Sequence, residues 1–249
     1  MNKLIRLPEV DSTNEEARRL ALRGAEEGTI VMADRQTAGR GRRGRSWYSD
    51  SADSLYFSIL LRPGFIPDRA SMVTLVAALA TGQAIERISG LKPAIKWPND
   101  LLLSEKKVCG ILTELHMEEG RIASLIVGIG INVNQKNFPG DIASMATSLQ
   151  IEKGKPVDKE RLLSALCDSF LEKYHEFLLH EDLSFLQTEY NTALISRGRQ
   201  VKVSGTAQEL VGEALGINTA GELLVKKEDG SIEPVYAGEV SVRGIYGYV

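Results

Sequence analysis

The stretch that decides the fold is residues 108–133, which read VCGILTELHMEEGRIASLIVGIGINV. Two runs rich in apolar residues, 108–117 and 121–133, flank the turn-forming residues 118–120 (EEG). Apolar runs of this length on either side of a glycine-containing turn are typical of a β-hairpin. The sequence therefore predicts two strands joined by a tight turn near the middle of the chain.

Further strands and helices surround this hairpin. Apolar runs bounded by glycine, proline or asparagine indicate strands, and apolar residues at helical spacing indicate helices. The other strands expected in this body are 29–33, 54–61, 94–97 and 101–103. The helices expected are 12–24, 71–88, 159–179 and 184–195, whereas residues 137–156 are expected to be irregular. This order predicts an α+β fold, a mixed β-sheet with flanking helices.

The spacing of apolar residues changes after residue 198. Short apolar runs replace the helical spacing, and they are separated by Gly205, Gly212, Gly216, Gly221 and Gly230. Such runs over about fifty residues are typical of a small β-barrel. We therefore place a boundary near Ser196, with one domain at 1–195 and a smaller one at 196–249.

The composition is that of a globular protein with a small negative charge. The 249 residues are 43% hydrophobic and 25% charged, with a formal net charge of -3 and an isoelectric point of about 5.8. This charge argues against bulk nucleic-acid binding, which usually rests on a broad basic face. The chain has two distant cysteines, Cys109 and Cys167, no signal-peptide pattern, and no apolar run longer than 72–80. We expect a cytoplasmic protein.

Residues 39–45, GRGRRGR, place four arginines among three glycines. Glycines let the backbone approach a ligand closely and guanidinium groups suit phosphate and carboxylate, so this segment predicts an anion-binding loop. The pattern also matches the dinucleotide fingerprint and nearly a phosphate-binding P-loop, but both need a helix after the last glycine. The sequence after Gly44 has no helical spacing, which argues against both. An RGG-like nucleic-acid tract and a solvated surface loop remain as alternatives.

Residues 96–100, KWPND, form a second candidate segment. Pro98 disfavours helix before it, so a strand would deliver Lys96 and Trp97 to one end of the sheet and then turn. A lysine there suits phosphate, and an indole suits stacking on a purine. Taken alone, the segment also fits an ordinary turn with a surface lysine.

Two glycine-containing strand segments complete the set. In 107–111, KVCGI, Lys107 beside Gly110 permits close approach of a small carboxylate, although a solvated lysine at a strand edge fits too. In 128–132, GIGIN, the glycines leave space for a flat ligand, although close packing on a helix fits as well.

The order and spacing of these motifs resemble those of the biotin protein ligases. The motifs are Gly-Arg-Gly-Arg-Arg-Gly-Arg-x-Trp, Lys-Trp-Pro-Asn-Asp, Lys-x-x-Gly-Ile-Leu-x-Glu and Gly-Ile-Gly-Ile-Asn. The resemblance extends from residues 12–14 (STN) to residues 238–243 (GEVSVR). It implies a catalytic domain like that of the class II synthetases, followed by an SH3-like C-terminal domain.

The resemblance implies that the chain activates biotin with ATP to biotinyl-5'-AMP and transfers biotin to a lysine of a biotin carboxyl carrier protein. Mg²⁺ would shield the leaving pyrophosphate, and no metal site made of protein ligands is expected. Some relatives carry an N-terminal DNA-binding domain, but here the STN motif begins at residue 12. We therefore expect the monofunctional type, which binds neither DNA nor membrane, and family members often form homodimers.

The resemblance also implies roles for single residues. Those expected at biotin are Ser12, Thr13, Asn14, Gln36, Gly39, Arg40, Gly41, Arg42, Lys107, Gly110 and Ile111. Those expected at ATP are Arg42, Arg43, Trp47, Lys96, Asn99, Asn132 and Arg243. Arg40, Arg42 and Lys107 are expected to act directly in catalysis, with Lys107 holding the carboxylate and later the bridging oxygen of the adenylate. No histidine lies in any of the motifs, so no base is named for the transfer step.

Two other functions are weighed against this one. A lipoate or octanoate ligase-type acyltransferase shares the catalytic fold, but its binding loop carries a different glycine-rich signature. A nucleic-acid-binding adaptor would use the arginines and the small β domain, but it leaves the spacing of the KWPND motif unexplained.

Overall fold

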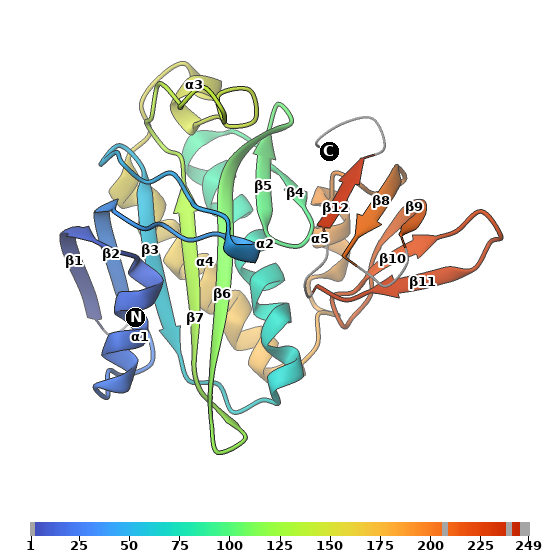
Figure 1. Ribbon diagram of the computed structural model, residues 1–249, viewed down its shortest axis with the longest axis horizontal. Helices are drawn as coiled ribbons and strands as arrows, with labels where there is room; N and C mark the ends of the chain where they lie inside the picture. Colours follow the sequence, from blue (N-terminus) through green and yellow to red (C-terminus); the bar gives the residue numbers. More distant parts are fainter. Residues whose placement is uncertain (1–2, 206–208, 238–240, 245–249) are drawn as a thin grey trace.

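A mixed seven-stranded sheet forms the body of the protein in this computed structural model, which describes residues 3–205, 209–237 and 241–244. Its strands are β1 (Lys3–Val10), β2 (Thr29–Gln36), β3 (Leu55–Leu61), β4 (Ala94–Lys96), β5 (Asp100–Leu103), β6 (Lys106–Glu118) and β7 (Arg121–Ile131). They lie in the order β1-β2-β3-β7-β6-β5-β4. Helix α1 (Thr13–Leu22) covers one face of the sheet, and α2 (Ala70–Ser89) and α4 (Lys159–His180) cover the other (Figure 1). The predicted mixed sheet with flanking helices is confirmed.

The predicted central hairpin is confirmed as strands β6 and β7. At the turn between them, Glu119 and Gly120 both have left-handed backbone angles, with φ of 48° and 77°. Glycine adopts this conformation without steric cost, which explains why the turn falls here. The register pairs Gly110 with Gly130, so two glycines lie side by side in the middle of the sheet.

The edge strand β1 has no counterpart among the strands expected from the sequence. Its residues are all exposed or half-buried, and Pro8 interrupts the apolar pattern. Proline is tolerated at a sheet edge, where its missing N–H faces solvent. β1 runs parallel to β2 and is joined to it through α1. The sequence therefore contains no hairpin turn from which the pairing of these two strands could be predicted.

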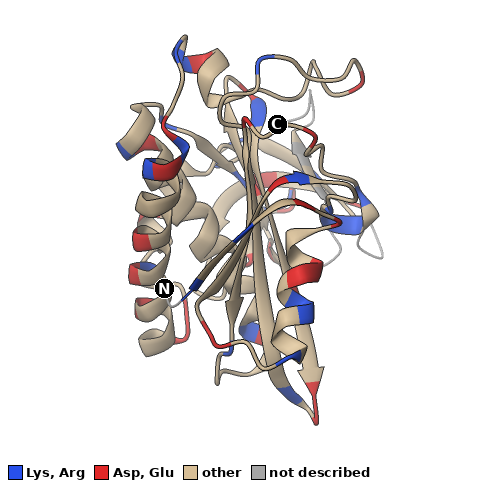
Figure 2. Ribbon diagram, turned by 90° about the vertical axis from the view of Figure 1, so that its left-hand side faces the viewer, with Lys and Arg blue, Asp and Glu red and all other residues tan. Residues whose placement is uncertain are grey.

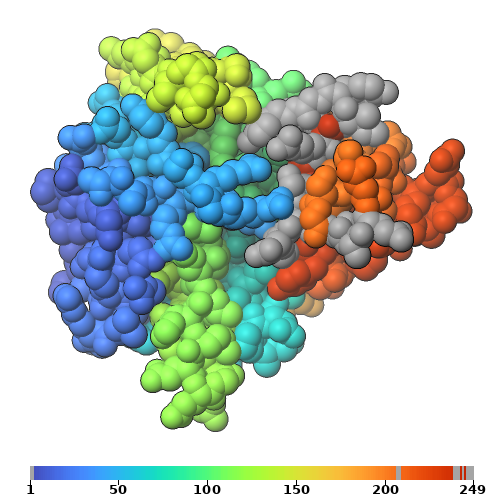
Figure 3. All heavy atoms as spheres, viewed as in Figure 1, coloured from blue at the N-terminus to red at the C-terminus, as the bar shows by residue number. Residues whose placement is uncertain are grey.

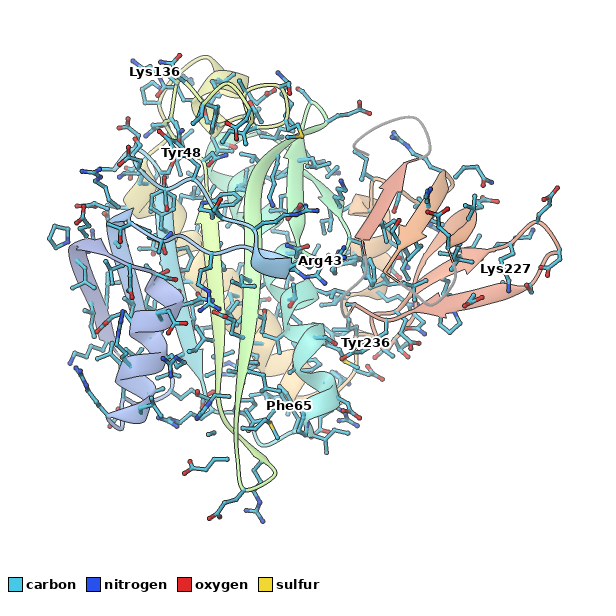
Figure 4. The ribbon with its side chains drawn as sticks, in the orientation of Figure 1. Arg43, Tyr48, Phe65, Lys136, Lys227 and Tyr236 are labelled. Atoms are coloured by element: carbon cyan, nitrogen blue, oxygen red, sulfur yellow. The ribbon has the colours of Figure 1, made fainter. Side chains whose placement is uncertain are left out.

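The main core lies between the sheet and the pair α2 and α4. Helix α2 is buried on most sides because it packs against both the sheet and α4. The apolar face predicted for the long helix is confirmed, since its five residues are all buried: Leu162, Leu166, Phe170, Tyr174 and Phe177. Phe65 closes this layer edge-on against Phe177, with ring centroids 5.4 Å apart (Figure 4). Residues of both charges recur along the helices (Figure 2).

Two short helices complete the body. Helix α3 (Leu149–Lys153) lies within the segment predicted to be irregular, and the Ser148 hydroxyl caps it by accepting the Ile151 N–H at 3.1 Å. Helix α5 (Gln187–Ala193) lies within the helix expected at 184–195. Within the described ranges, every helix is too short or too polar to cross a membrane.

A separate antiparallel sheet forms the C-terminal part and confirms the small β domain. Its strands are β8 (Gln200–Ser204), β9 (Leu210–Ile217), β10 (Leu223–Lys226), β11 (Ile232–Val235) and β12 (Ser241–Gly244). They lie in the order β11-β10-β9-β8-β12, beside the β4 edge of the large sheet (Figure 1). The boundary predicted near Ser196 falls between α5 and β8 and stays a prediction.

Trp97 ties the two parts together. Its indole is 3% exposed, and its Nε1–H donates to the carbonyl oxygen of Gly221 at 3.0 Å. The interpretation of Trp97 as a platform for a purine is therefore wrong, because the ring is committed to the contact with the C-terminal domain. A sequence motif at the end of a strand does not show which partner covers it.

Trp97→Phe should destabilise the protein by about 1–3 kcal/mol, because it leaves the buried Gly221 carbonyl without its donor. Chemical unfolding monitored by circular dichroism would measure this change. Trp47→Phe is the matched control, since it removes the same atoms from an indole whose Nε1 has no hydrogen-bond partner among the described residues. Equal effects of the two substitutions would contradict this account.

Candidate functional site

Two adjoining cavities open on the α1 face of the sheet, and Gln36, Trp47 and Lys107 line both. The smaller cavity, of about 50 Å³, lies at the N-terminus of α1. The larger cavity, of about 1040 Å³, lies between the segment after β2 and the segment 132–146. In Figure 3 the first of these segments crosses the face toward the C-terminal domain.

Most of the predicted site residues meet at these cavities. The smaller cavity is lined by Ser12, Thr13, Asn14, Gln36, Arg40, Gly41, Arg42, Trp47, Asn99, Lys107, Gly110 and Ile111. Gly39 and Asn132 line the larger cavity. Arg43 and Lys96 line neither of the two, and Arg43 is exposed near the C-terminal domain (Figure 4). Arg243 lies in β12, and its side chain is outside the described part of the chain.

Glycines on two neighbouring strands form the floor of the smaller cavity. Gly110 on β6 is paired with Gly130 on β7, and Gly128 lies two residues before Gly130 on the same face. The protein's own side chains use the space that these residues leave. A Cβ added at Gly130 would lie 2.6 Å from the Trp47 indole, and one added at Gly128 would lie 2.0 Å from the Asn14 amide oxygen.

Buried polar side chains surround the N-terminus of α1. Thr13 and Asn14 are each 4% exposed, and the backbone N–H of Thr13 donates to Gln36 Oε1 at 2.9 Å. The Ser58 hydroxyl lies 2.8 Å from Thr13 Oγ1 and 2.6 Å from Asn14 Oδ1. Asn14 Nδ2 donates to Glu114 Oε2 at 2.7 Å. This network fixes donors and acceptors at one end of the smaller cavity, where a polar ring would be recognised.

The arginine-rich segment folds back on itself. Gly41 N–H donates to the Arg45 carbonyl at 2.7 Å, and Trp47 N–H donates to the Gly39 carbonyl at 2.9 Å. Between these contacts lies a single 3₁₀ turn, Arg42–Gly44, after which the backbone is extended. No α-helix follows in residues 45–54, all of which are described, so the argument against a dinucleotide fingerprint or P-loop holds.

The arginines of this segment have different partners. Arg40 pairs with Glu15, and its Nη2 lies 2.9 Å from Glu114 Oε1. Arg42 donates to Asn99 Oδ1 and to the Ala237 carbonyl, each at 3.1 Å. The second contact joins the segment to the C-terminal domain.

Burial lowers the pKa of the Arg42 guanidinium, with Asp100 opposing that shift. Arginine pKa values lie so far above neutrality that the group stays charged. Arg42 is therefore a partly desolvated cation at the cavity, where an anion gains more than it would in water.

Lys107 stands where the two cavities meet. Its Nζ lies 2.7 Å from Asp100 Oδ1 and 5.1 Å from the centroid of the Trp47 ring. Gly110 lets this side chain lie across the strand, since an added Cβ there would come within 3.1 Å of Nζ. An anion that reaches from one cavity to the other would pass this ammonium group.

Asn132 and Cys109 are held inside the protein. Asn132 is 4% exposed and donates to the Thr147 carbonyl at 3.0 Å, so its amide secures the backbone before α3. Cys109 is fully buried, and that burial raises the pKa of its thiol far above the ordinary value. The thiolate form is therefore disfavoured, and Cys109 is not a reactive group.

No functional role was predicted for the residues of the outer wall of the larger cavity. This wall contains a group of apolar residues: Phe138, Pro139, Ile142, Met145 and Ala146. They belong to the segment expected to be irregular, where proline and glycine interrupt the spacing of apolar residues that would indicate a helix or a strand. The sequence feature that could have indicated this wall is the presence of several apolar residues in a predicted loop, where no packing partner was expected for them.

The comparisons with known proteins agree with this geometry. Residues 7–132, half of the chain, match the family described as "Biotin/lipoate A/B protein ligase family". The chain belongs to the biotin/lipoate A/B protein ligase family. Residues 197–243 match "Biotin protein ligase C terminal domain", which confirms the resemblance to the biotin protein ligases.

Relatives of this family match between two thirds and nearly all of this chain. It is similar to the "Bifunctional ligase/repressor BirA" of Bacillus spizizenii, 38% identical over 237 residues that cover 94% of this chain and 72% of that protein. It is also similar to the "Biotin--[acetyl-CoA-carboxylase] ligase" of Paracoccus denitrificans, 40% identical over 169 residues, which cover 66% and 70% of the two chains. Among solved structures, the biotin protein ligase of Aquifex aeolicus in complex with biotin and ATP is similar, with a TM-score of 0.86 and 36% identity. That match covers 98% of this chain and 100% of the other.

Gly128→Ala should destabilise the protein by about 1–3 kcal/mol, because the new Cβ displaces the Asn14 amide from its buried hydrogen bonds. Thermal unfolding would measure this effect. Gly82→Ala is the control, since Gly82 lies inside α2 with no atom within 4 Å of an added Cβ. That change should stabilise the protein by up to about 1 kcal/mol. A stable Gly128→Ala protein would show that the Asn14 network is not fixed as described.

Proposed function

We propose that this chain activates biotin with ATP to biotinyl-5'-AMP and then transfers biotin to a lysine of a biotin carboxyl carrier protein. The observation that carries the proposal is the position of Lys107 at the junction of the two cavities. A carboxylate bound in one cavity and a phosphate bound in the other meet at this ammonium group. The similarity over 98% of the chain to a structure that holds both biotin and ATP supports the same reaction.

Biotin belongs in the smaller cavity. The network at Thr13, Asn14 and Gln36 supplies fixed polar groups for the ureido ring, and the glycine floor supplies a flat surface. The cavity of about 50 Å³ is far below the usual 300–1,000 Å³ of ligand sites. Because the indole of Trp47 lies on Gly110 and Gly130, the arginine-rich segment must move outward when biotin enters and then close over it.

ATP belongs in the larger cavity, and we place its adenine against the apolar wall formed by Phe138, Ile142 and Met145. This arrangement points the phosphates toward Lys107. In the first step a carboxylate oxygen of biotin attacks the α-phosphorus, the bond to the bridging oxygen breaks, and pyrophosphate leaves. Arg40, Arg42 and Lys107 offset the repulsion between the two anions, so positioning and charge stabilisation drive the step.

Mg²⁺ fits this site as an ion that enters with the nucleotide. Among the described residues, no group of three or more His, Cys, Asp or Glu is placed to hold a metal. Mg²⁺ typically binds through substrate phosphates and one or two carboxylates, and Asp141 lines the larger cavity. The ion would shield the charge of the leaving pyrophosphate.

The second step transfers the acyl group. The amine of the carrier lysine attacks the acyl carbon of the adenylate, AMP leaves with the bridging oxygen, and the amine loses a proton. Neither cavity has a histidine in its lining, so we name no protein base. Homodimer formation, the absence of DNA binding and the cytoplasmic location stay predictions.

The direct test incubates the protein with ATP, Mg²⁺, a biotin carboxyl carrier domain and either biotin or lipoate. We expect pyrophosphate release and a mass increase of the carrier domain when biotin is supplied and not when lipoate is supplied. The reason is that the polar end of the smaller cavity matches a ureido ring. Modification with lipoate and not with biotin would favour the lipoate-ligase alternative. Mass spectrometry of the intact carrier domain gives the readout.

Lys107→Ala should reduce the rate of biotin-dependent pyrophosphate release by about 10²-fold or more, as loss of a charge-stabilising group does in other enzymes. Lys106→Ala is the matched control, since Lys106 is exposed on the same strand and lines neither cavity. The fold should survive both changes, as circular dichroism would verify. Activity of the Lys107 variant within a few-fold of the control would show that its assigned role is wrong.

A further inference from the structure

Glu114 does not line the smaller cavity, but it contacts two residues that do, Asn14 and Arg40. It follows Gly110 and Leu112 on the same face of β6, and it is held in the sheet opposite Ile126 of β7. Glu114 is the last residue of the Lys-x-x-Gly-Ile-Leu-x-Glu motif, and no role was predicted for it. Its side chain is 31% exposed, which leaves its carboxylate partly shielded from water.

The two oxygens of Glu114 serve two different parts of the site. Oε2 accepts from Asn14 Nδ2 at 2.7 Å, at the polar end of the smaller cavity. Oε1 lies 2.9 Å from Arg40 Nη2, in the arginine-rich segment. Among the hydrogen bonds and ion pairs of the described residues, none joins Asn14 directly to Arg40. Glu114 therefore links Asn14, at the polar end of the smaller cavity, to Arg40 in the arginine-rich segment.

A carboxylate is required for this double contact. Both partners are donors, and an ionised carboxylate accepts through both oxygens without donating. A glutamine has one acceptor oxygen and an amide that would face one of the two donors. The Asn14 amide cannot turn to compensate without moving Oδ1 away from the Ser58 hydroxyl, 2.6 Å away.

We propose that Glu114 is a positioning residue that couples occupation of the biotin end to closure of the arginine-rich segment. When biotin binds beside Asn14, the arginine-rich segment closes over the ligand, because the carboxylate that accepts from Asn14 also holds Arg40. The inference rests on the proposed function, because it takes biotin as the ligand of the smaller cavity.

Glu15 provides a matched control. It pairs with the same guanidinium group of Arg40, and it sits on α1 rather than on the sheet. Its other ion-pair partner is Arg18, at 2.9 Å, and no hydrogen bond among the described residues joins its side chain to the Asn14 amide. Glu15→Gln and Glu114→Gln thus each remove one carboxylate charge that is paired with Arg40. Only Glu114→Gln also disturbs the contact with Asn14.

The experiment measures tryptic cleavage at Arg40, Arg42, Arg43 and Arg45 with and without biotin, at biotin concentrations well above the Kd found by calorimetry. We expect biotin to slow this cleavage by about fivefold or more in the wild type and in Glu15→Gln, the lower end of typical coupling between sites. In Glu114→Gln the protection should shrink to less than about twofold, because the coupling is lost. Thermal unfolding verifies that each variant is folded, and Glu114→Asp, too short to reach both partners, replaces Glu114→Gln if that variant does not fold.

Each outcome decides one question. Equal protection by biotin in Glu114→Gln and wild type overturns the inference, as does an equal loss of protection in Glu15→Gln. Loss of biotin binding in Glu114→Gln alone supports the link to Asn14. Failure of the wild type to bind biotin would instead contradict the proposed function.

Discussion

A sheet covered on both faces leaves no room for a ligand unless side chains are missing from one of them. In this protein they are missing at Gly110, Gly128 and Gly130, on the two central strands of the large sheet. The space above these glycines receives Asn14 from α1 and Trp47 from the arginine-rich segment. The helix terminus and the segment both approach the sheet at this floor, so the polar network and Lys107 lie beside it.

The cationic groups around the floor have partners within the protein before any ligand binds. Arg40 pairs with two carboxylates, Lys107 with Asp100, and Arg42 with neutral oxygen atoms of Asn99 and the Ala237 carbonyl. A phosphate or carboxylate that enters competes with these carboxylates for Arg40 and Lys107, because two anions at one cation repel each other. Arg42 also joins the segment to the C-terminal domain, which gives that domain a contact at the site.

Sequence reasoning succeeded where local chemistry decides the structure. The hairpin around residues 118–120 and the buried face of α4 followed from turn residues and spacing. It failed where distant segments decide the structure. The edge strand β1 depends on a crossover to β2, and Trp97 depends on a carbonyl more than a hundred residues later in the chain.

The candidate site shows the same division. The motif residues that line the smaller cavity were accessible to sequence comparison, because glycine and arginine at fixed spacing carry a recognisable pattern. The apolar wall around Phe138 and the double contact of Glu114 were not, since both arise from the approach of segments far apart in the chain. Lys96 was grouped with the site by its motif, but it lines neither cavity.

The most direct measurement is a crystal structure of the protein with biotin and a non-hydrolysable ATP analogue. We predict biotin on Gly110 and Gly130, with its carboxylate at Lys107, the phosphates beyond it, the Asn14 amide still over Gly128, and the Trp47 indole moved off the floor. Biotin bound elsewhere, or bound with the indole still lying on Gly110 and Gly130, would contradict this prediction.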